Sequence, residues 1–365
     1  MKFQINKKIL SSILIQASKT IPTRSTLPIL SCALFEVVEN DLIIKTTNLE
    51  IYYLKRTQVN NAEQGKIAIP IHKLIEITTA IDDELLNVSV SDIGKIELET
   101  EAGKYTIMGQ QADEFPSDPV INDAQTITLK SEQIINIIKA TTYATSKDDM
   151  KPVLQGVYLL FEGEKITAVA TDGHKLVKFE TSTPTSYSGV LIVPVKFLNT
   201  IKDIVSGNVE VYIGENHIQT TNETTTISSR IIKEKYPNYE KVIPQDNPNT
   251  LVVDKNELIE SVKRISIFSN KTTKQIALSI NEDHAIITTE DAESVTSGTE
   301  KITCDYSGQA ITIGYNAIYL LEVLKQQQTN PIKILLKNPL SAAVFLDIGE
   351  ENKKTTLLMP IRLND

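Results

Sequence analysis

The chain has 365 residues, of which 37 are Lys or Arg and 46 are Asp or Glu, so its formal net charge is -9. With 41% hydrophobic and 23% charged residues it has the composition of an ordinary globular protein, which excludes a disordered or fibrous chain. No apolar run approaches the roughly 18 residues of a membrane span. Lys7 and Lys8 precede only a short apolar run without a cleavage site, so we expect a cytoplasmic protein with no membrane segment.

Six amphipathic helices are predicted along the chain, two in each third. In the first of them Leu10, Ile13 and Leu14 recur at helical spacing, and in the third Ile134 and Ile138 do the same. The predicted helices cover residues 7–19, 72–80, 131–141, 195–203, 255–264 and 316–325.

Between these helices the apolar residues alternate with a period of two, which is typical of strands with one face on a core. Leu86, Val88 and Val90 form one such run, and residues 332–336 form another. Clusters of Gly, Asn and acidic residues, such as residues 39–41, provide the hairpin turns between strands. The sequence therefore predicts an α+β fold with antiparallel sheets.

The chain also repeats itself with an offset of 124 residues. Residues 27–30 (LPIL) align with 151–154 (KPVL), and residues 68–70 (AIP) align with 192–194 (IVP). A third copy is weaker, with an ITIG segment at 311–314. We therefore expect three similar domains, at residues 1–120, 125–246 and 250–365.

Positive charge is concentrated on the predicted helices, which carry eleven Lys or Arg and only six Asp or Glu within an acidic chain. One interpretation is that Lys is a good helix former on solvated faces. The other is that equivalent helices of a repeat share one positive surface, which would attract a polyanion through sequence-independent phosphate contacts.

Five segments carry a resemblance to a known family. They are Met1-Lys2-Phe3, the RSTLPIL run at 24–30, the ATDGHKL run at 170–176, the YPNY run at 236–239, and the MPIRL run at 359–363. In their order and spacing they make the chain resemble the bacterial DNA polymerase III beta subunit, the sliding clamp, from Met1 to Leu363.

The resemblance implies the DNA clamp fold: three similar domains, each with two helices packed on antiparallel sheets, closing into a ring as a head-to-tail homodimer. It implies a non-catalytic processivity factor that encircles duplex DNA without sequence specificity and uses no cofactor. The partners implied are the alpha subunit of the replicative DNA polymerase, a clamp loader and other proteins with a clamp-binding motif.

The resemblance also implies three sets of site residues. A pocket for a partner peptide would include Leu154, Thr171, Gly173, His174, Lys175, Leu176, Pro237, Val242, Asn316, Tyr319, Leu340, Leu357, Met359, Pro360, Ile361 and Arg362. The dimer interface would include Lys73, Tyr105, Ile107, Ile267 and Phe268. The residues facing DNA would include Lys7, Lys8, Arg24, Lys139, Lys196, Lys202 and Lys263.

The sequence departs from the family pattern at several places, among them Lys175, Lys241 and the segment 147–152. Lys175 stands where some members have Arg, which puts bidentate hydrogen bonding in doubt. The segment 147–152 lacks the aromatic pair of some members.

Two other functions compete with the clamp. A repeat scaffold that does not bind DNA would use the helix lysines only for solubility. A hydrolase could use Asp172 and His174, although no GxSxG, Walker A or GxGxxG motif is present. No metal site is expected, because the four His are not spaced as ligands on one element and Cys32 and Cys304 lie far apart.

Overall fold

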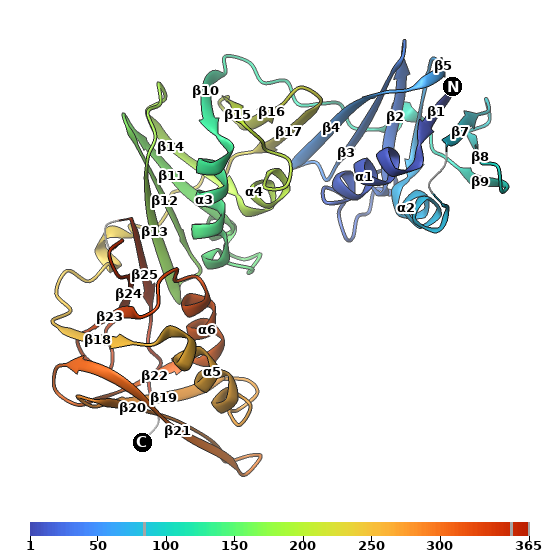
Figure 1. Cartoon of the computed structure of the whole chain (residues 1–365). Coiled ribbons are helices and arrows are strands. Elements are labelled where there is room, and N and C mark those ends of the chain that lie inside the picture. The colour runs from blue at the N-terminus through green and yellow to red at the C-terminus, as the bar shows by residue number, and fades with distance from the viewer. Residues whose placement is uncertain (83–84, 351–352, 364–365) are drawn as a thin grey trace. The chain divides into compact units, whose positions relative to one another are not determined.

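The computed structural model describes residues 1–82, 85–350 and 353–363, and it has the α+β architecture that the sequence predicts (Figure 1). The chain forms two compact units, Met1–Ile134 with Lys196–Ile231, and Ile135–Val195 with Ile232–Asp365. The middle third of the chain contributes strands to both units.

The six predicted helices are confirmed within the described residues, with ends that shift by at most two positions. Side-chain caps fix three of their starts: Asn6 accepts a hydrogen bond from Lys8 N, Asp254 from Glu257 N, and Asn316 from Ile318 N. The helices are α1 (Lys7–Ser18), α2 (Ile71–Ala80), α3 (Ser131–Thr141), α4 (Val195–Ile201), α5 (Lys255–Ser266) and α6 (Ala317–Lys325).

The first unit contains two antiparallel sheets. The smaller sheet has the order β5 (Asn60–Glu63), β1 (Lys2–Asn6), β7 (Leu85–Val90), β8 (Lys95–Glu99) and β9 (Lys104–Met108). The larger has the order β10 (Gln125–Lys130), β15 (Asn208–Ile213), β16 (His217–Thr221), β17 (Thr225–Arg230), β4 (Ile51–Gln58), β3 (Asp41–Thr47), β2 (Cys32–Val38) and β6 (Gly65–Pro70).

The second unit contains one continuous antiparallel sheet of 12 strands. Strand β21 (Thr296–Ser307) joins the two parts of this sheet, because residues 304–307 pair with β18 (Asn249–Val253) while residues 296–303 pair with β20 (His284–Asp291). The order is β14 (Gly189–Pro194), β11 (Gly156–Glu162), β12 (Lys165–Thr171), β13 (Lys175–Ser182), β25 (Lys354–Leu358), β24 (Ala343–Asp347), β23 (Ile332–Leu336), β18 (Asn249–Val253), β21 (Thr296–Ser307), β20 (His284–Asp291), β19 (Gln275–Ile280) and β22 (Ile311–Asn316).

The internal repeat is visible in the structure. Strands β6, β14 and β22 each run into a helix, and the three share one burial pattern, with three consecutive buried residues followed by one half-buried residue. The two proline segments of the repeat open equivalent short 3-10 helices, η1 (Pro28–Ser31) and η4 (Pro152–Gln155).

Successive domains are joined through their sheets. In the first unit β17 pairs with β4, and in the second unit β25 pairs with β13. The corresponding strand of the first domain is β9, which pairs only with β8 among the described residues. The corresponding strand of the third domain is β21, whose residues 296–303 pair only with β20 within the described part of the chain.

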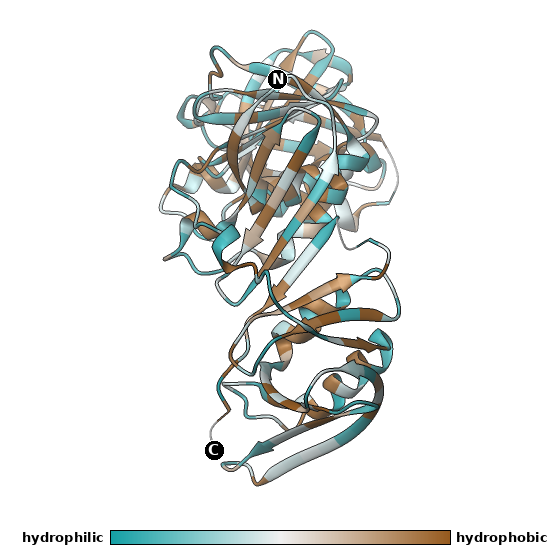
Figure 2. Ribbon diagram, turned by 90° about the vertical axis from the view of Figure 1, so that its left-hand side faces the viewer, coloured by the Kyte–Doolittle hydropathy of each residue, from teal (hydrophilic) through white to brown (hydrophobic). Residues whose placement is uncertain are grey.

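The helix pair of the third domain covers a sheet with its apolar face. Helices α5 and α6 lie side by side against the strands of the third domain, and their buried residues, such as Leu258, Val262 and Leu320, join one core with Ile276 and Ile334 (Figure 1). Figure 2 shows hydrophobic residues interspersed with hydrophilic ones along the strands and helices. No helix in the described part of the chain is long and apolar enough to span a membrane.

Candidate partner-binding site

The turn between β12 and β13 is built by Asp172. Its Oδ1 atom accepts hydrogen bonds from the backbone N–H groups of His174 and Lys175, both at 2.9 Å. Gly173 has a φ of 93°, a left-handed conformation that favours glycine. The Asp172 carboxylate therefore binds two backbone amides and the Lys175 ammonium, while the His174 ring stacks on Tyr319. Asp172 and His174 thus do not form a hydrolase dyad.

Lys175 is the charged centre of the site. Only 4% of its side chain is exposed, and its Nζ lies 2.5 Å from Asp172 Oδ2 and 2.9 Å from Glu322 Oε2. Burial lowers the pKa of Lys175, but the hydrogen bonds and charges of Asp172 and Glu322 outweigh it, so the pKa is raised above its ordinary value. The ammonium therefore stays protonated and joins β13 to α6.

Tyr319 of α6 faces this charged centre. Its ring stacks on His174 with a centroid distance of 5.1 Å, and Lys175 Nζ lies 4.7 Å from the ring centroid. Asn316 fixes the start of α6, because its Oδ1 caps the N–H groups of Ile318 and Tyr319 and its Nδ2 donates to Thr273 O at 2.9 Å. The structure thus brings four predicted pocket residues together.

An apolar cluster lies beside this charged centre. Three predicted pocket residues, Leu154, Leu176 and Leu357, are buried in it. Sequence reasoning missed the other buried members, which come from strands and from the YPNY segment: Val169, Ile192, Tyr236, Tyr239, Val344 and Leu346. Both tyrosines belong to the YPNY segment at 236–239, which is one of the five segments that carry the family resemblance.

The C-terminal segment Met359–Leu363, which we call the tail, borders the same region. Met359 N donates to His174 O at 2.8 Å, and Ile361 N donates to Gly314 O at 2.9 Å. The Met359 side chain is 45% exposed, so a flexible apolar group is available at the surface.

Four other predicted pocket residues are exposed at the surface. Pro237, Val242, Leu340 and Arg362 are exposed and are not among the members of the apolar cluster within the described part of the chain. Sequence reasoning missed Glu322, the second partner of Lys175, because an acidic residue on a helix gives no sign of the lysine that it meets in the fold.

The predicted interface residues are mostly apolar and lie at or near the surface. Ile267 and Phe268 follow the end of α5 and are 76% and 40% exposed. Phe268 packs on β21, where a Cβ on Gly298 would lie 3.2 Å from Phe268 Cδ2. Tyr105 is exposed on β9 and Ile107 is half-buried there. Lys73 pairs with Glu76 at 2.6 Å on α2.

The residues predicted to face DNA lie at the surface of helices or next to them. Lys8, Lys139, Lys196 and Lys263 are exposed on helices, and Lys7 is half-buried at the start of α1. Arg24 is exposed in the loop that follows α1. Lys202 was predicted within a helix at 195–203, but α4 ends at Ile201, and Lys202 is exposed in the turn that follows.

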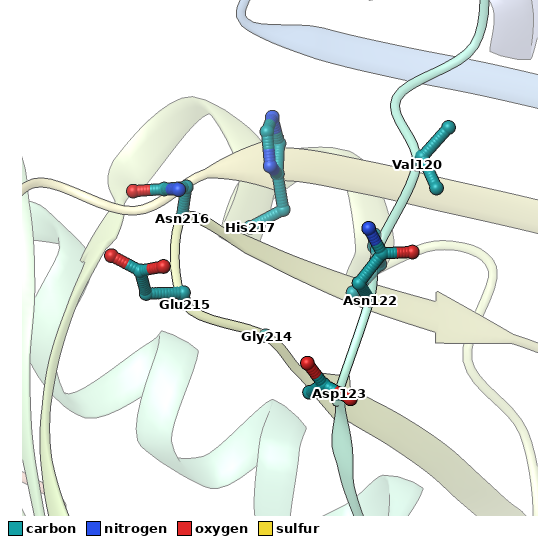
Figure 3. A pocket seen from close by; sticks show the side chains of 8 residues that line it. Val120, Asn122, Asp123, Gly214, Glu215, Asn216 and His217 are labelled. Atoms are coloured by element: carbon teal, nitrogen blue, oxygen red, sulfur yellow. The ribbon is translucent and has the colours of Figure 1, made fainter.

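A cavity of about 500 Å³ lies elsewhere, between residues 120–123 and the turn at 214–217 that joins β15 to β16 (Figure 3). Gly214 permits close packing here, since a Cβ on it would lie 2.6 Å from Ile121 Cγ2. Burial and the nearby Arg230 lower the pKa of His217. None of the predicted site residues lines this cavity.

No group of three or more His, Cys, Asp or Glu side chains suited to a metal ion occurs among the residues that the structure describes. Cys32 and Cys304 are free thiols.

Three domain models of one protein family together match almost the whole chain. The N-terminal, central and C-terminal domains of the DNA polymerase III beta subunit match residues 1–119, 128–238 and 240–362. The beta sliding clamp of Pseudomonas putida is 29% identical over 370 residues, with 100% of both chains covered. The beta sliding clamp of Chlamydia pneumoniae is 23% identical over 369 residues, also with 100% of both chains covered.

Solved structures agree with these matches. The Pseudomonas aeruginosa sliding clamp bound to griselimycin has a TM-score of 0.90 and 27% identity, with 100% of both chains covered. The Bacillus subtilis sliding clamp has a TM-score of 0.91 at 20% identity, also with 100% of both chains covered, and shows the likeness of fold alone. The chain therefore belongs to the DNA polymerase III beta subunit family, the non-catalytic sliding clamps of DNA replication.

Proposed function

We propose that two copies of this chain close head to tail into a ring around duplex DNA, and that the ring tethers the replicative DNA polymerase alpha subunit and other proteins through a peptide pocket at the Lys175 site. The three domains of each copy are residues 1–120, 125–246 and 250–365. A clamp loader would open and close the ring, and the protein would act in the cytoplasm.

The pattern of strand pairing supports the head-to-tail arrangement. Two domain junctions are formed by strand pairs, β17 with β4 and β25 with β13. The equivalent strands that remain are β9 of the first domain and residues 296–303 of β21 in the third, and each has one edge unpaired among the described residues. An unpaired edge is a template for a strand of another chain. Pairing β9 of one copy with β21 of the next would repeat the same junction and close a ring.

Exposed side chains beside these edges support the same interface. Tyr105 lies on β9, and Ile267 and Phe268 lie next to β21. Burying these apolar groups against a second copy would stabilise the dimer by about 25 cal/mol per Å² of apolar surface.

The observation that carries the tethering function is the combination of groups around Lys175. A buried apolar floor, the stacked rings of His174 and Tyr319, and the exposed Met359 lie in one unit of the chain. Apolar walls with a few fixed polar groups are typical of a site that binds a short peptide.

The direct test is fluorescence anisotropy of a labelled QLxLF-type clamp-binding peptide with the purified protein. We expect saturable binding that is lost when Met359–Asp365 is deleted. Binding should weaken about tenfold in Met359→Ala, because the apolar contact between the Met359 side chain and the bound peptide is removed. Val120→Ala, which trims an exposed apolar side chain far along the chain from the site, is the matched control and should bind as the wild type does. Wild-type protein that is folded yet does not bind the peptide would contradict the pocket.

A further inference from the structure

The tail is attached to the rest of the protein through two backbone hydrogen bonds. Met359 N donates to His174 O at the turn before β13, and Ile361 N donates to Gly314 O on β22. Pro360, which lies between them, has no N–H group to donate. Ile361 and Gly314 form an isolated antiparallel bridge, so the tail adds a short piece of strand to the outer edge of β22.

Gly314 is the point of closest approach between the tail and the sheet. It is buried, and a Cβ placed on it would lie 2.6 Å from Ile361 O and 2.7 Å from Leu363 Cδ2. A collision with a side chain can be relieved by a rotamer change, but Ile361 O is a backbone atom, so the chain itself would have to move. The tail can lie this close only because residue 314 has no side chain.

The backbone conformation does not require glycine at this position. Gly314 is not among the described residues with a positive φ, and it lies inside a regular strand that pairs with Ala277 of β19. Alanine could therefore adopt the same φ and ψ. The reason for glycine lies in the contact with the tail.

We propose that Gly314 is a positioning residue that holds the tail against β22 and thereby fixes the tail side of the peptide pocket. This inference rests on the proposed function, because it assigns Gly314 a role in shaping that pocket. Gly314 does not touch the peptide. It acts through Ile361 and Leu363, which lie directly on it, and through Met359 and Pro360, which the tail places beside His174.

Gly314 also links the tail to the other wall of the pocket. Strand β22 ends at Asn316, the residue that caps α6 and fixes the position of Tyr319. The tail, the last residues of β22 and the start of α6 therefore form one connected wall. Gly314 lies where the tail crosses β22.

The test is amide hydrogen exchange together with peptide binding in Gly314→Ala. We expect the protection of the Ile361 amide to fall at least tenfold while the amides of β19 and β22 stay protected, since the sheet is intact. We expect the dissociation constant of the clamp-binding peptide to rise about tenfold. Thr312→Ala is the matched control, because Thr312 is two residues earlier on the same face of β22 and exposed, and it should leave both quantities unchanged.

A shorter tail provides a second arm. When residues 361–365 are deleted, peptide binding should weaken, and adding Gly314→Ala should weaken it no further, because the atoms with which a Cβ would collide are gone. Leu363→Ala removes the side chain that lies on Gly314 without changing the strand, and it should also reduce protection of the Ile361 amide. If Gly314→Ala unfolds the third domain, Leu363→Ala still tests whether contact at Gly314 positions the tail.

The inference is overturned by an Ile361 amide that stays protected in Gly314→Ala and in Leu363→Ala, or by equal loss of peptide affinity from Gly314→Ala with and without the tail. Its failure is distinct from failure of the proposed function. If wild-type protein does not bind the peptide, the pocket is wrong, while a Gly314-dependent Ile361 amide would still show that the glycine positions the tail.

Discussion

At the scale of single residues, Lys175 is buried and held by two ion pairs. A buried ammonium is stable only with opposite charges in contact, and Asp172 and Glu322 supply them from β12 and α6. Lys175, which the sequence predicts as one of several pocket residues, therefore also links the β12–β13 turn to α6.

Removing this ammonium should destabilise the fold. In Lys175→Met two carboxylates lose their common partner, so we expect the free energy of unfolding to fall by about 3 kcal/mol, the low end for a broken buried pair because Glu322 is 37% exposed. Urea denaturation measures this. Lys178→Met, which breaks a surface pair with Glu180, should cost less than about 1 kcal/mol. An equal loss of unfolding free energy in the two variants would show that the ion pairs of Lys175 stabilise the fold no more than a surface pair does.

Asp347 predicts a pH dependence of stability. Burial raises its pKa, but the Lys354 ammonium and the N–H groups of Thr329 and Gln328 outweigh burial and hold the pKa below its ordinary value of 3.8. A carboxyl with a lowered folded-state pKa stabilises the fold above pH 3.8, and this contribution is lost as the pH falls through the folded-state value.

The stability difference between wild type and Asp347→Asn should therefore be largest near neutral pH and shrink below about pH 3.8. Denaturant titrations at a series of pH values measure it. A difference that does not change with pH would mean that the charge of Asp347 contributes nothing to stability.

At the scale of elements, the architecture depends on sheets that continue from one domain into the next. Strand pairs β17–β4 and β25–β13 join domains within the chain, and β9 and β21 retain free edges among the described residues. The exposed apolar pair after α5 lies next to one of these edges.

Ile267→Ala combined with Phe268→Ala should convert the proposed dimer into folded monomers, because it removes exposed apolar surface that only a second copy would bury. Sedimentation velocity measures the change in mass, and circular dichroism checks the fold. Val190→Ala, which trims an exposed side chain on β14, is the control and should remain dimeric. A double variant that sediments as a full dimer would reject this interface.

The elements themselves were largely predictable from the sequence, since helical spacing and period-two alternation depend on local burial. All six helices follow from such patterns, and the repeat of β6, β14 and β22 follows from the 124-residue offset and its weaker third copy. The site was less predictable. Leu154, Leu176 and Leu357 are brought together by strands far apart in the chain, and Glu322 and Gly314 act through contacts that only the fold creates.

At the scale of the whole molecule, an acidic protein with basic helices suits weak and mobile contact with DNA. The net charge of -9 opposes general attraction to phosphate, while lysines such as Lys139 and Lys196 remain exposed on helices. A ring needs no tight contact with DNA, because its closure keeps the DNA inside.

Direct binding to linear duplex should be weak and should fall steeply with salt. Lys196→Gln combined with Lys202→Gln should weaken it for all sequences alike and reduce the salt slope by about 2, roughly 0.9 for each lost phosphate contact. Binding measured over a salt series tests this. Lys165→Gln with Lys178→Gln on β12 and β13 changes the net charge equally and should leave the slope unchanged. A similar change of slope in both double variants would contradict a DNA-facing role for Lys196 and Lys202.

The most direct test of the central claim is retention on DNA of different topology. The protein is loaded onto a nicked circular plasmid with a clamp loader and ATP, and the complex is passed over a sizing column at high salt before and after a single cut linearises the plasmid. We predict that the protein elutes with the circular plasmid and is lost from the linear one, because only a closed ring on a closed circle is held without strong contacts. Equal retention on circular and linear DNA would contradict a topological clamp.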